Sequence, residues 1–166
     1  MAPTLAHAMD TLSATGSEFY RTFNVRHVFQ DYTRGAWVYE QPIETIIAEL
    51  RSIVEDCSEI GWDGYKSLPV SHRTIEVARS AALRIPRAAR PEIAPEADGE
   101  ISFEWYKAPN LQFTFSIGEK EIISYAGRIG NERFHGTVRY LETLPDIVYT
   151  SLARIYGLSL PVVVLK

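Results

Sequence analysis

Three side chains in the 166-residue sequence could act together in acid and base chemistry, namely Asp63, Glu104 and His135. Carboxylates and an imidazole can transfer protons near neutral pH when burial or a neighbouring charge adjusts their pKa values. Glu100 lies four residues before Glu104, and this even spacing places both carboxylates on one face of a strand. These residues are compatible with a small hydrolase-like enzyme. The face that carries the two glutamates is expected to be solvated, however, which favours an ordinary surface role.

No recognised signature of a metal site or a nucleophile supports the enzyme hypothesis. Gly-x-Ser-x-Gly and Walker-type loops are absent, and no two histidines have the spacing of zinc ligands. The single cysteine, Cys57, falls on an apolar helical stripe, where it is expected to be a core residue. We therefore expect no metal and no other cofactor. The four histidines are His7, His27, His72 and His135.

The location of the protein is suggested by three features of the sequence. One cysteine cannot form an internal disulfide, which is typical of a reducing compartment. The first residues lack a basic segment followed by an apolar one, and no apolar run reaches the length of a membrane span. The expectation is a cytoplasmic protein without a membrane partner.

The densest cluster of chemically versatile residues is the stretch "GWDGYKSLP", residues 61–69. It can be explained as a corner between two helices, with Trp62 packed between helix and sheet, Asp63 closing a turn onto its own backbone, and Tyr65 exposed. Alternatively, Asp63 and Tyr65 face a partner or ligand. The candidate binding residues, counting those of the sheet and of an arginine-rich segment, are Trp62, Asp63, Tyr65, Glu104, Tyr125, Arg84 and Arg87.

The charge distribution is uneven, although the net charge is only −4. Residues 73–90 carry five arginines and one acid, whereas residues 91–104 carry five acids and no Lys or Arg. The two segments either pair with each other or form two separate charged surfaces for oppositely charged partners. The mild overall acidity disfavours general attraction to nucleic acid, but the arginine segment leaves nucleic-acid binding open as a second alternative. The arginines are Arg73, Arg79, Arg84, Arg87 and Arg90.

The elements that must position these residues follow from the hydrophobic period. Helical spacing predicts an amphipathic helix over residues 42–59, a second helix between an N-cap at Ser71 and a stop at Pro86, and a third near residues 144–156. Alternation predicts strands near residues 101–106, 111–117, 121–127 and 133–139, with "PEIAP" as an edge strand and the tail "LSLPVVVLK" as a short edge strand. The fold class is therefore α+β, with an antiparallel meander of about four to five strands covered on one face by two to three helices.

The chain divides into a single α+β domain, residues 41–166, and an N-terminal extension, residues 1–40. The extension begins without a clear period, and a hairpin with strands near residues 22–30 and 36–40 is expected within it. Its seven aromatic side chains bear too much apolar area to remain in water, so we expect them to dock on the sheet or on a second copy of the chain. They are Phe19, Tyr20, Phe23, Phe29, Tyr32, Trp37 and Tyr39.

Four segments together resemble a widespread, uncharacterised family of small bacterial proteins. They are "GWDGYKSLPVS", "PEIAPEADGEISFEW", "LQFTFSIGEKEIISYAG" and a following "HGT", within about residues 60–155. Members of that family carry a Trp-Asp-Gly-Tyr, an Asp-Gly-Glu-Ile hairpin entering a Glu-Trp strand, and a Ser-Tyr-Ala-Gly strand. The resemblance implies a gene in a mobile or variable neighbourhood beside another small gene, as in a toxin-antitoxin or phage-defence pair. It implies no assigned activity.

An aromatic and charged cluster without a catalytic signature is typical of an interaction surface. The leading hypothesis is a non-catalytic protein-interaction protein of a bacterial or phage mobile-element system, whose partner is the product of an adjacent gene. The alternatives are the hydrolase-like enzyme using Asp63, Glu104 and His135, and a nucleic-acid binder using the arginine segment.

Overall fold

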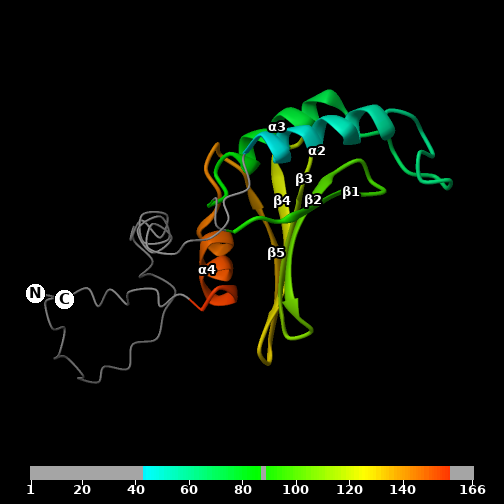
Figure 1. Cartoon of the computed structure of the whole chain (residues 1–166). Coiled ribbons are helices and arrows are strands. Elements are labelled where there is room, and N and C mark those ends of the chain that lie inside the picture. Colours follow the sequence, from blue (N-terminus) through cyan, green and yellow to red (C-terminus); the bar gives the residue numbers. More distant parts are fainter. Residues whose placement is uncertain (1–42, 87–88, 158–166) are drawn as a thin grey trace, which may run out of the picture.

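The computed structural model describes residues 43–86 and 89–157 (Figure 1). The N-terminal extension, its expected hairpin and the expected strand in the C-terminal tail lie outside the described residues. The described helices are α2 (Ile43–Asp56), α3 (His72–Ala82) and α4 (Asp146–Ile155). The strands are β1 (Glu92–Pro95), β2 (Ile101–Ala108), β3 (Leu111–Ile117), β4 (Ile122–Ile129) and β5 (Glu132–Arg139).

The five strands form one sheet in the order β1-β2-β3-β4-β5, and every neighbouring pair is antiparallel. The predicted α+β meander is therefore confirmed, including the short edge strand at "PEIAP". The connections between neighbouring strands are short, as in hairpins. In the β1–β2 connection, Gly99 adopts the left-handed conformation that a tight turn needs (φ 82°).

The inner face of the sheet carries the aromatic core. Phe103 lies opposite Phe115, and Trp105 lies opposite Phe113, so that four rings from β2 and β3 pack together. The ring centroids of Phe103 and Phe115 are 4.8 Å apart, within the range of stacked aromatic pairs. The indole N–H of Trp105 donates to the Ala89 carbonyl oxygen at 2.8 Å, which satisfies the only polar atom of this buried side chain.

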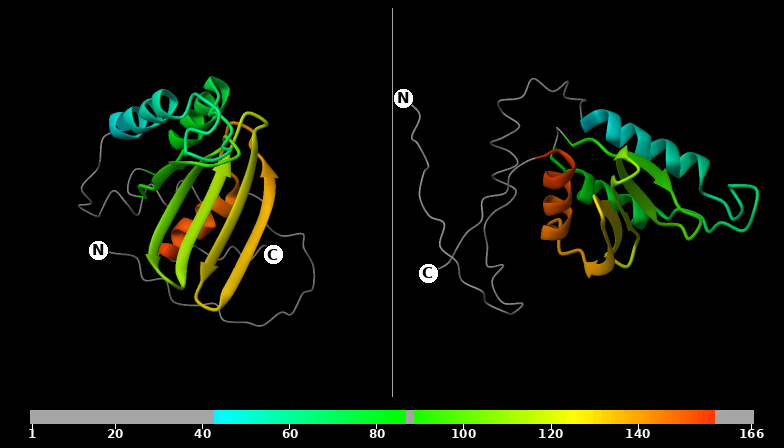
Figure 2. Two further views of the ribbon diagram at one scale, coloured as in Figure 1. Left: turned by 90° about the vertical axis from the view of Figure 1, so that its right-hand side faces the viewer. Right: turned by 90° about the horizontal axis from the view of Figure 1, so that it is seen from below.

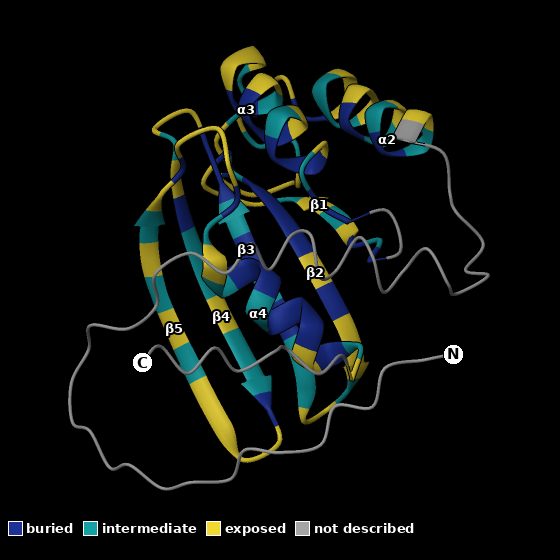
Figure 3. Cartoon of the chain, turned by 90° about the vertical axis from the view of Figure 1, so that its left-hand side faces the viewer, coloured by how far each residue is buried: buried dark blue, intermediate teal, exposed yellow. Residues whose placement is uncertain are grey.

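Helices cover this inner face, as predicted. Helix α4 packs on β3 and β4, α3 packs on β2 and β3, and α2 packs on α3 and β1 (Figure 3). On α4, Val148, Leu152 and Ile155 are all buried. No described helix lies on the opposite, outer face of the sheet, which is open in the left view of Figure 2.

The two ends of α3 agree with the signals read from the sequence, and a glycine follows α4. The Ser71 hydroxyl oxygen accepts a hydrogen bond from the Thr74 backbone N–H at 3.0 Å, so Ser71 is the N-cap of α3. Helix α3 ends at Ala82, a few residues before Pro86. Gly157 follows α4 with φ 68°, the left-handed conformation that terminates many helices.

Two aromatic rings of the inner face lie over glycines of the neighbouring strand. Phe134 on β5 covers Gly127 on β4, and Tyr125 on β4 covers Gly136 on β5. A Cβ atom built on Gly127 would lie 2.4 Å from Phe134 Cζ, and one on Gly136 would lie 2.6 Å from Tyr125 Oη. The rings therefore occupy the space that any other residue would need, which explains why these strand positions hold glycine.

Candidate functional site

The loop between α2 and α3, residues 57–71, has a defined backbone hydrogen-bond pattern. The Gly61 N–H donates to the Ser67 carbonyl oxygen at 2.9 Å, and the Val70 N–H donates to the Cys57 carbonyl oxygen at 2.9 Å. Gly61 has φ 77°, and a Cβ there would lie 2.9 Å from the Tyr65 carbonyl oxygen. The loop is thus folded on itself by its own backbone, and Gly61 is required for this path.

Trp62 and Asp63 hold the loop through their side chains. The Trp62 indole N–H donates to the Leu68 carbonyl oxygen at 2.9 Å, while its ring packs against the core. Asp63 Oδ1 accepts a hydrogen bond from the Tyr65 N–H at 2.8 Å, which is the predicted turn of an aspartate onto its own backbone. This bond, with a second from Ser67, lowers the pKa of the Asp63 carboxyl below its ordinary value. Trp62 packs against the core and is half-buried, so it is not a fully buried residue.

The same loop exposes three large apolar side chains, which we call the apolar loop residues. They are Ile60, Tyr65 and Leu68, with 77%, 85% and 52% of their surfaces exposed. The loop projects beyond the ends of α2 and α3 (Figure 1), and its Leu68 N–H donates to the Ala97 carbonyl oxygen in the β1–β2 turn at 2.8 Å. Burying such side chains against a partner would be favourable, because apolar surface gains free energy when it leaves water.

The structure does not bring the three acid and base residues together. Glu104 and His135 lie in one row on the outer face, but Thr114 of β3 and Ala126 of β4 separate them. Three strand spacings correspond to about 14 Å, far beyond hydrogen-bond reach. Asp63 lies in the loop between α2 and α3, where its carboxylate accepts the Tyr65 N–H. These residues therefore form no catalytic constellation.

Other predicted binding residues are also separated. Tyr125 lies on the inner face, where its ring covers Gly136, whereas Glu104 is exposed on the outer face. Glu100 shares the outer side of the sheet as predicted, and its carboxylate accepts a hydrogen bond from the Ser116 hydroxyl at 2.6 Å. Thus Tyr125 and Glu104 cannot contribute to one compact surface.

The arginine-rich segment does not pair with the acidic segment that follows it, at least among the described residues. Arg73 forms ion pairs with Glu76 (3.2 Å) and Glu121 (2.5 Å). Arg90 pairs with Glu49 of α2. Arg84 donates from Nε to the Glu142 carbonyl oxygen at 3.1 Å, and Arg87 lies outside the described residues. Arg73 and Arg90 thus form ion pairs with acids from other parts of the fold. This weakens the case for nucleic-acid binding through the arginine-rich segment.

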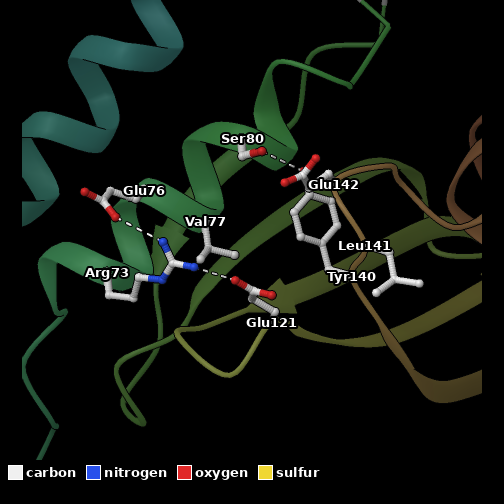
Figure 4. Close-up of a pocket in the computed structure, with 8 residues that line it drawn as sticks. All are labelled: Arg73, Glu76, Val77, Ser80, Glu121, Tyr140, Leu141 and Glu142. Atoms are coloured by element: carbon white, nitrogen blue, oxygen red, sulfur yellow. Dashed lines mark hydrogen bonds and ion pairs between the residues drawn. The ribbon is translucent and has the colours of Figure 1, made fainter.

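A pocket of about 450 Å³ lies between α3, the β3–β4 turn and the segment after β5 (Figure 4). Arg73 spans its floor between Glu76 and Glu121, and the hydroxyls of Ser80 and Tyr140 are hydrogen-bonded at 2.9 Å. No local sequence pattern predicts this pocket, because α3 supplies one wall and segments about 50 to 70 residues further along the chain supply the others. Its lining residues are Arg73, Glu76, Val77, Ser80, Glu121, Tyr140, Leu141 and Glu142.

Two lining residues of this pocket have unusual backbone conformations. Glu121 and Glu142 adopt φ 57° and 59°, in the left-handed region that favours glycine. Both residues line the pocket, and the Glu121 carboxylate forms an ion pair with Arg73. The pocket's acids are thus partly neutralised by the protein's own arginine.

In residues 43–86 and 89–157, no group of three or more His, Cys, Asp or Glu side chains is placed to hold a metal ion. Within the same residues, none of the helices has the length and apolar character needed to cross a membrane. Cys57 is buried, and burial raises the pKa of its thiol, with a smaller contribution from Asp56.

Comparison with known proteins adds no relative: no family model, no curated protein and no solved structure matches this chain. The function must therefore be argued from the arrangement of the residues.

Proposed function

We propose that this chain is a non-catalytic interaction protein that docks on a protein partner through the loop between α2 and α3. The observation that carries this proposal is the exposure of Ile60, Tyr65 and Leu68 on a loop whose backbone is hydrogen-bonded at several points. Exposed aromatic and aliphatic side chains of this kind are typical of interface hot spots.

The rigidity of the loop supports the same conclusion. The bonds from Tyr65 N–H to Asp63 and from the Trp62 indole to Leu68 fix the conformation in which the apolar side chains are presented. A loop that is ordered before binding loses less conformational entropy in the complex. Trp62 thus anchors the loop to the core, Asp63 shapes it, and Tyr65 contacts the partner.

The wider setting of this proposal comes from the family resemblance. The partner is then the product of an adjacent gene in a bacterial or phage mobile-element or defence system, and the complex is cytoplasmic. The separation of Asp63, Glu104 and His135 supports a role without catalysis.

Co-expression with the product of the adjacent gene tests the proposal. The wild-type chain should co-purify with that product, and Tyr65→Ala should weaken the complex by about 30-fold, as truncation of a hot-spot side chain does. Leu83→Ala is the matched control, because Leu83 is also a large exposed apolar residue (50%) but lies at the C-terminal end of α3, away from the loop that precedes this helix. Equal retention of the partner by the wild type and Tyr65→Ala would show that this loop is not the docking site.

A further inference from the structure

Four polar or aromatic side chains form a line across the outer face of the sheet. Tyr106 of β2, Gln112 of β3, Arg128 of β4 and Arg133 of β5 are partners in register, one on each successive strand. We call these four residues the cross-strand row. The row extends over about 14 Å, because neighbouring strands lie about 4.8 Å apart. The outer face that carries it is seen in the left view of Figure 2.

The two arginines of the row repel each other. Like charges directly opposite on neighbouring strands destabilise a sheet, and Arg128 and Arg133 occupy such positions. Among the described residues, no acid forms an ion pair with either of them. The Nε atom of Arg128 is buried and has no hydrogen-bond partner. A bound anion would relieve the repulsion between the two guanidinium groups.

The surroundings of the row extend its positive charge. The outward residues of β3, β4 and β5 include Arg128, Arg133 and Arg139 but no acid. Acids of this face are Glu92 of β1, Glu104 of β2 and Glu100 just before β2, and the Glu100 carboxylate accepts a hydrogen bond from Ser116 of β3. Local attraction for anions is therefore strong here, despite the net charge of −4.

The other half of the row is suited to a base rather than to an anion. Tyr106 is 57% exposed, so its ring is accessible for stacking, and Gln112 beside it offers both a donor and an acceptor. The adjacent outward positions on β3 and β4 are the small residues Thr114 and Ala126, which leave the surface flat. A flat ligand can thus lie across the strands.

We propose that the cross-strand row binds single-stranded nucleic acid, independently of the docking loop. Arg128 and Arg133 hold a phosphate, the Tyr106 ring stacks on a base, and Gln112 hydrogen-bonds a base edge. This combination of a cationic track and a stacking side chain is how proteins bind single strands. An acidic peptide would match the arginines but would leave Tyr106, at the far end of the row, without a role.

Fluorescence anisotropy with labelled single strands of about 12 nucleotides, within the usual range of site sizes, tests this proposal. DNA and RNA versions are compared at low salt. Arg133→Gln and Tyr106→Ala should each weaken binding about tenfold, and Tyr106→Phe should retain it because the ring remains. Arg133→Gln should also reduce the slope of log K against log salt by about 0.7. The matched control is Arg51→Gln, which removes the same charge from the exposed face of α2 and should leave binding unchanged.

Three results would overturn the proposal. The first is the absence of measurable binding to either single strand at low salt. The second is equal weakening by Arg51→Gln and Arg133→Gln, which would indicate nonspecific attraction. The third is binding of a glutamate-rich peptide that depends on Arg133 but not on Tyr106, with no such dependence for nucleic acid. Loss of binding in Tyr65→Ala is not expected, so this test is distinct from that of the docking loop.

Discussion

Replacement of Gly127 by alanine should destabilise the protein through one identifiable contact, the ring of Phe134. The new Cβ would lie 2.4 Å, 2.8 Å and 3.0 Å from three carbon atoms of that ring, where ordinary contact requires at least 3.4 Å. The ring must therefore move by about 1 Å or turn away. Phe134 also stacks on Phe113, with centroids 6.2 Å apart, so the movement disturbs a second aromatic contact.

The expected cost follows from these contacts. Overpacking of a well-packed interior costs about 1 to 3 kcal/mol, and a disturbed aromatic pair costs about 0.5 to 1.5 kcal/mol. The lower chain entropy of unfolded alanine offsets about 0.4 to 1 kcal/mol. Because Phe134 is only half-buried and can yield, we expect a net loss of about 1 to 2 kcal/mol for Gly127→Ala.

A double-mutant cycle measured by urea denaturation isolates the contact. In a Phe134→Leu background the ring is absent, so Gly127→Ala should be neutral or slightly stabilising. The coupling energy between the two positions should thus be about 1 to 2 kcal/mol. An equal loss in both backgrounds, or a Gly127→Ala protein as stable as the wild type, would refute the explanation of these glycines by ring packing.

Three other perturbations test single features of the fold. Ser71→Ala removes the N-cap of α3 and should lower the free energy of unfolding by about 1 kcal/mol, whereas Ser71→Asn, an uncharged capping residue beside the Glu119 carboxylate, should retain most of it in the same urea assay. Trp62→Ala should cost about 2 to 3 kcal/mol, less than a fully buried tryptophan because the side chain is only half-buried; an unchanged urea midpoint would show that the loop does not depend on the ring. Hydrogen bonds in the folded loop, first that from the Tyr65 N–H, lower the pKa of Asp63 from its ordinary value of 3.8. The ionised carboxylate therefore stabilises the fold fully above pH 3.8, and this stabilisation is lost as the pH falls through the lowered pKa. The difference in Tm between Asp63→Asn and the wild type should therefore narrow below about pH 4, and a constant difference would contradict this assignment.

Local features of the sequence were sufficient to predict the described elements. The apolar stripes of α2 and α4, the alternation of β2 and β3, and the cap at Ser71 each depend on residues within one or two turns of chain. The turn at Asp63 is equally local, because its carboxylate binds a backbone N–H two residues away. Tyr125 could have been assigned to the inner face in the same way, since the buried Ile123 precedes it by two residues.

The surfaces depend on pairings that no local pattern contains. Tyr106 and Arg133 are 27 residues apart in the sequence. They belong to the same cross-strand row only because three hairpins bring four strands into register. The same register keeps Glu104 and His135 two intervening strands apart, and the fold of α3 against the β3–β4 turn pairs Arg73 with Glu121. A shift of one residue in any strand would exchange its inner and outer side chains. The sequence by itself thus determined the helices, strands and turns, while packing of the aromatic inner face set the register and, with it, which polar side chains meet on the outer one.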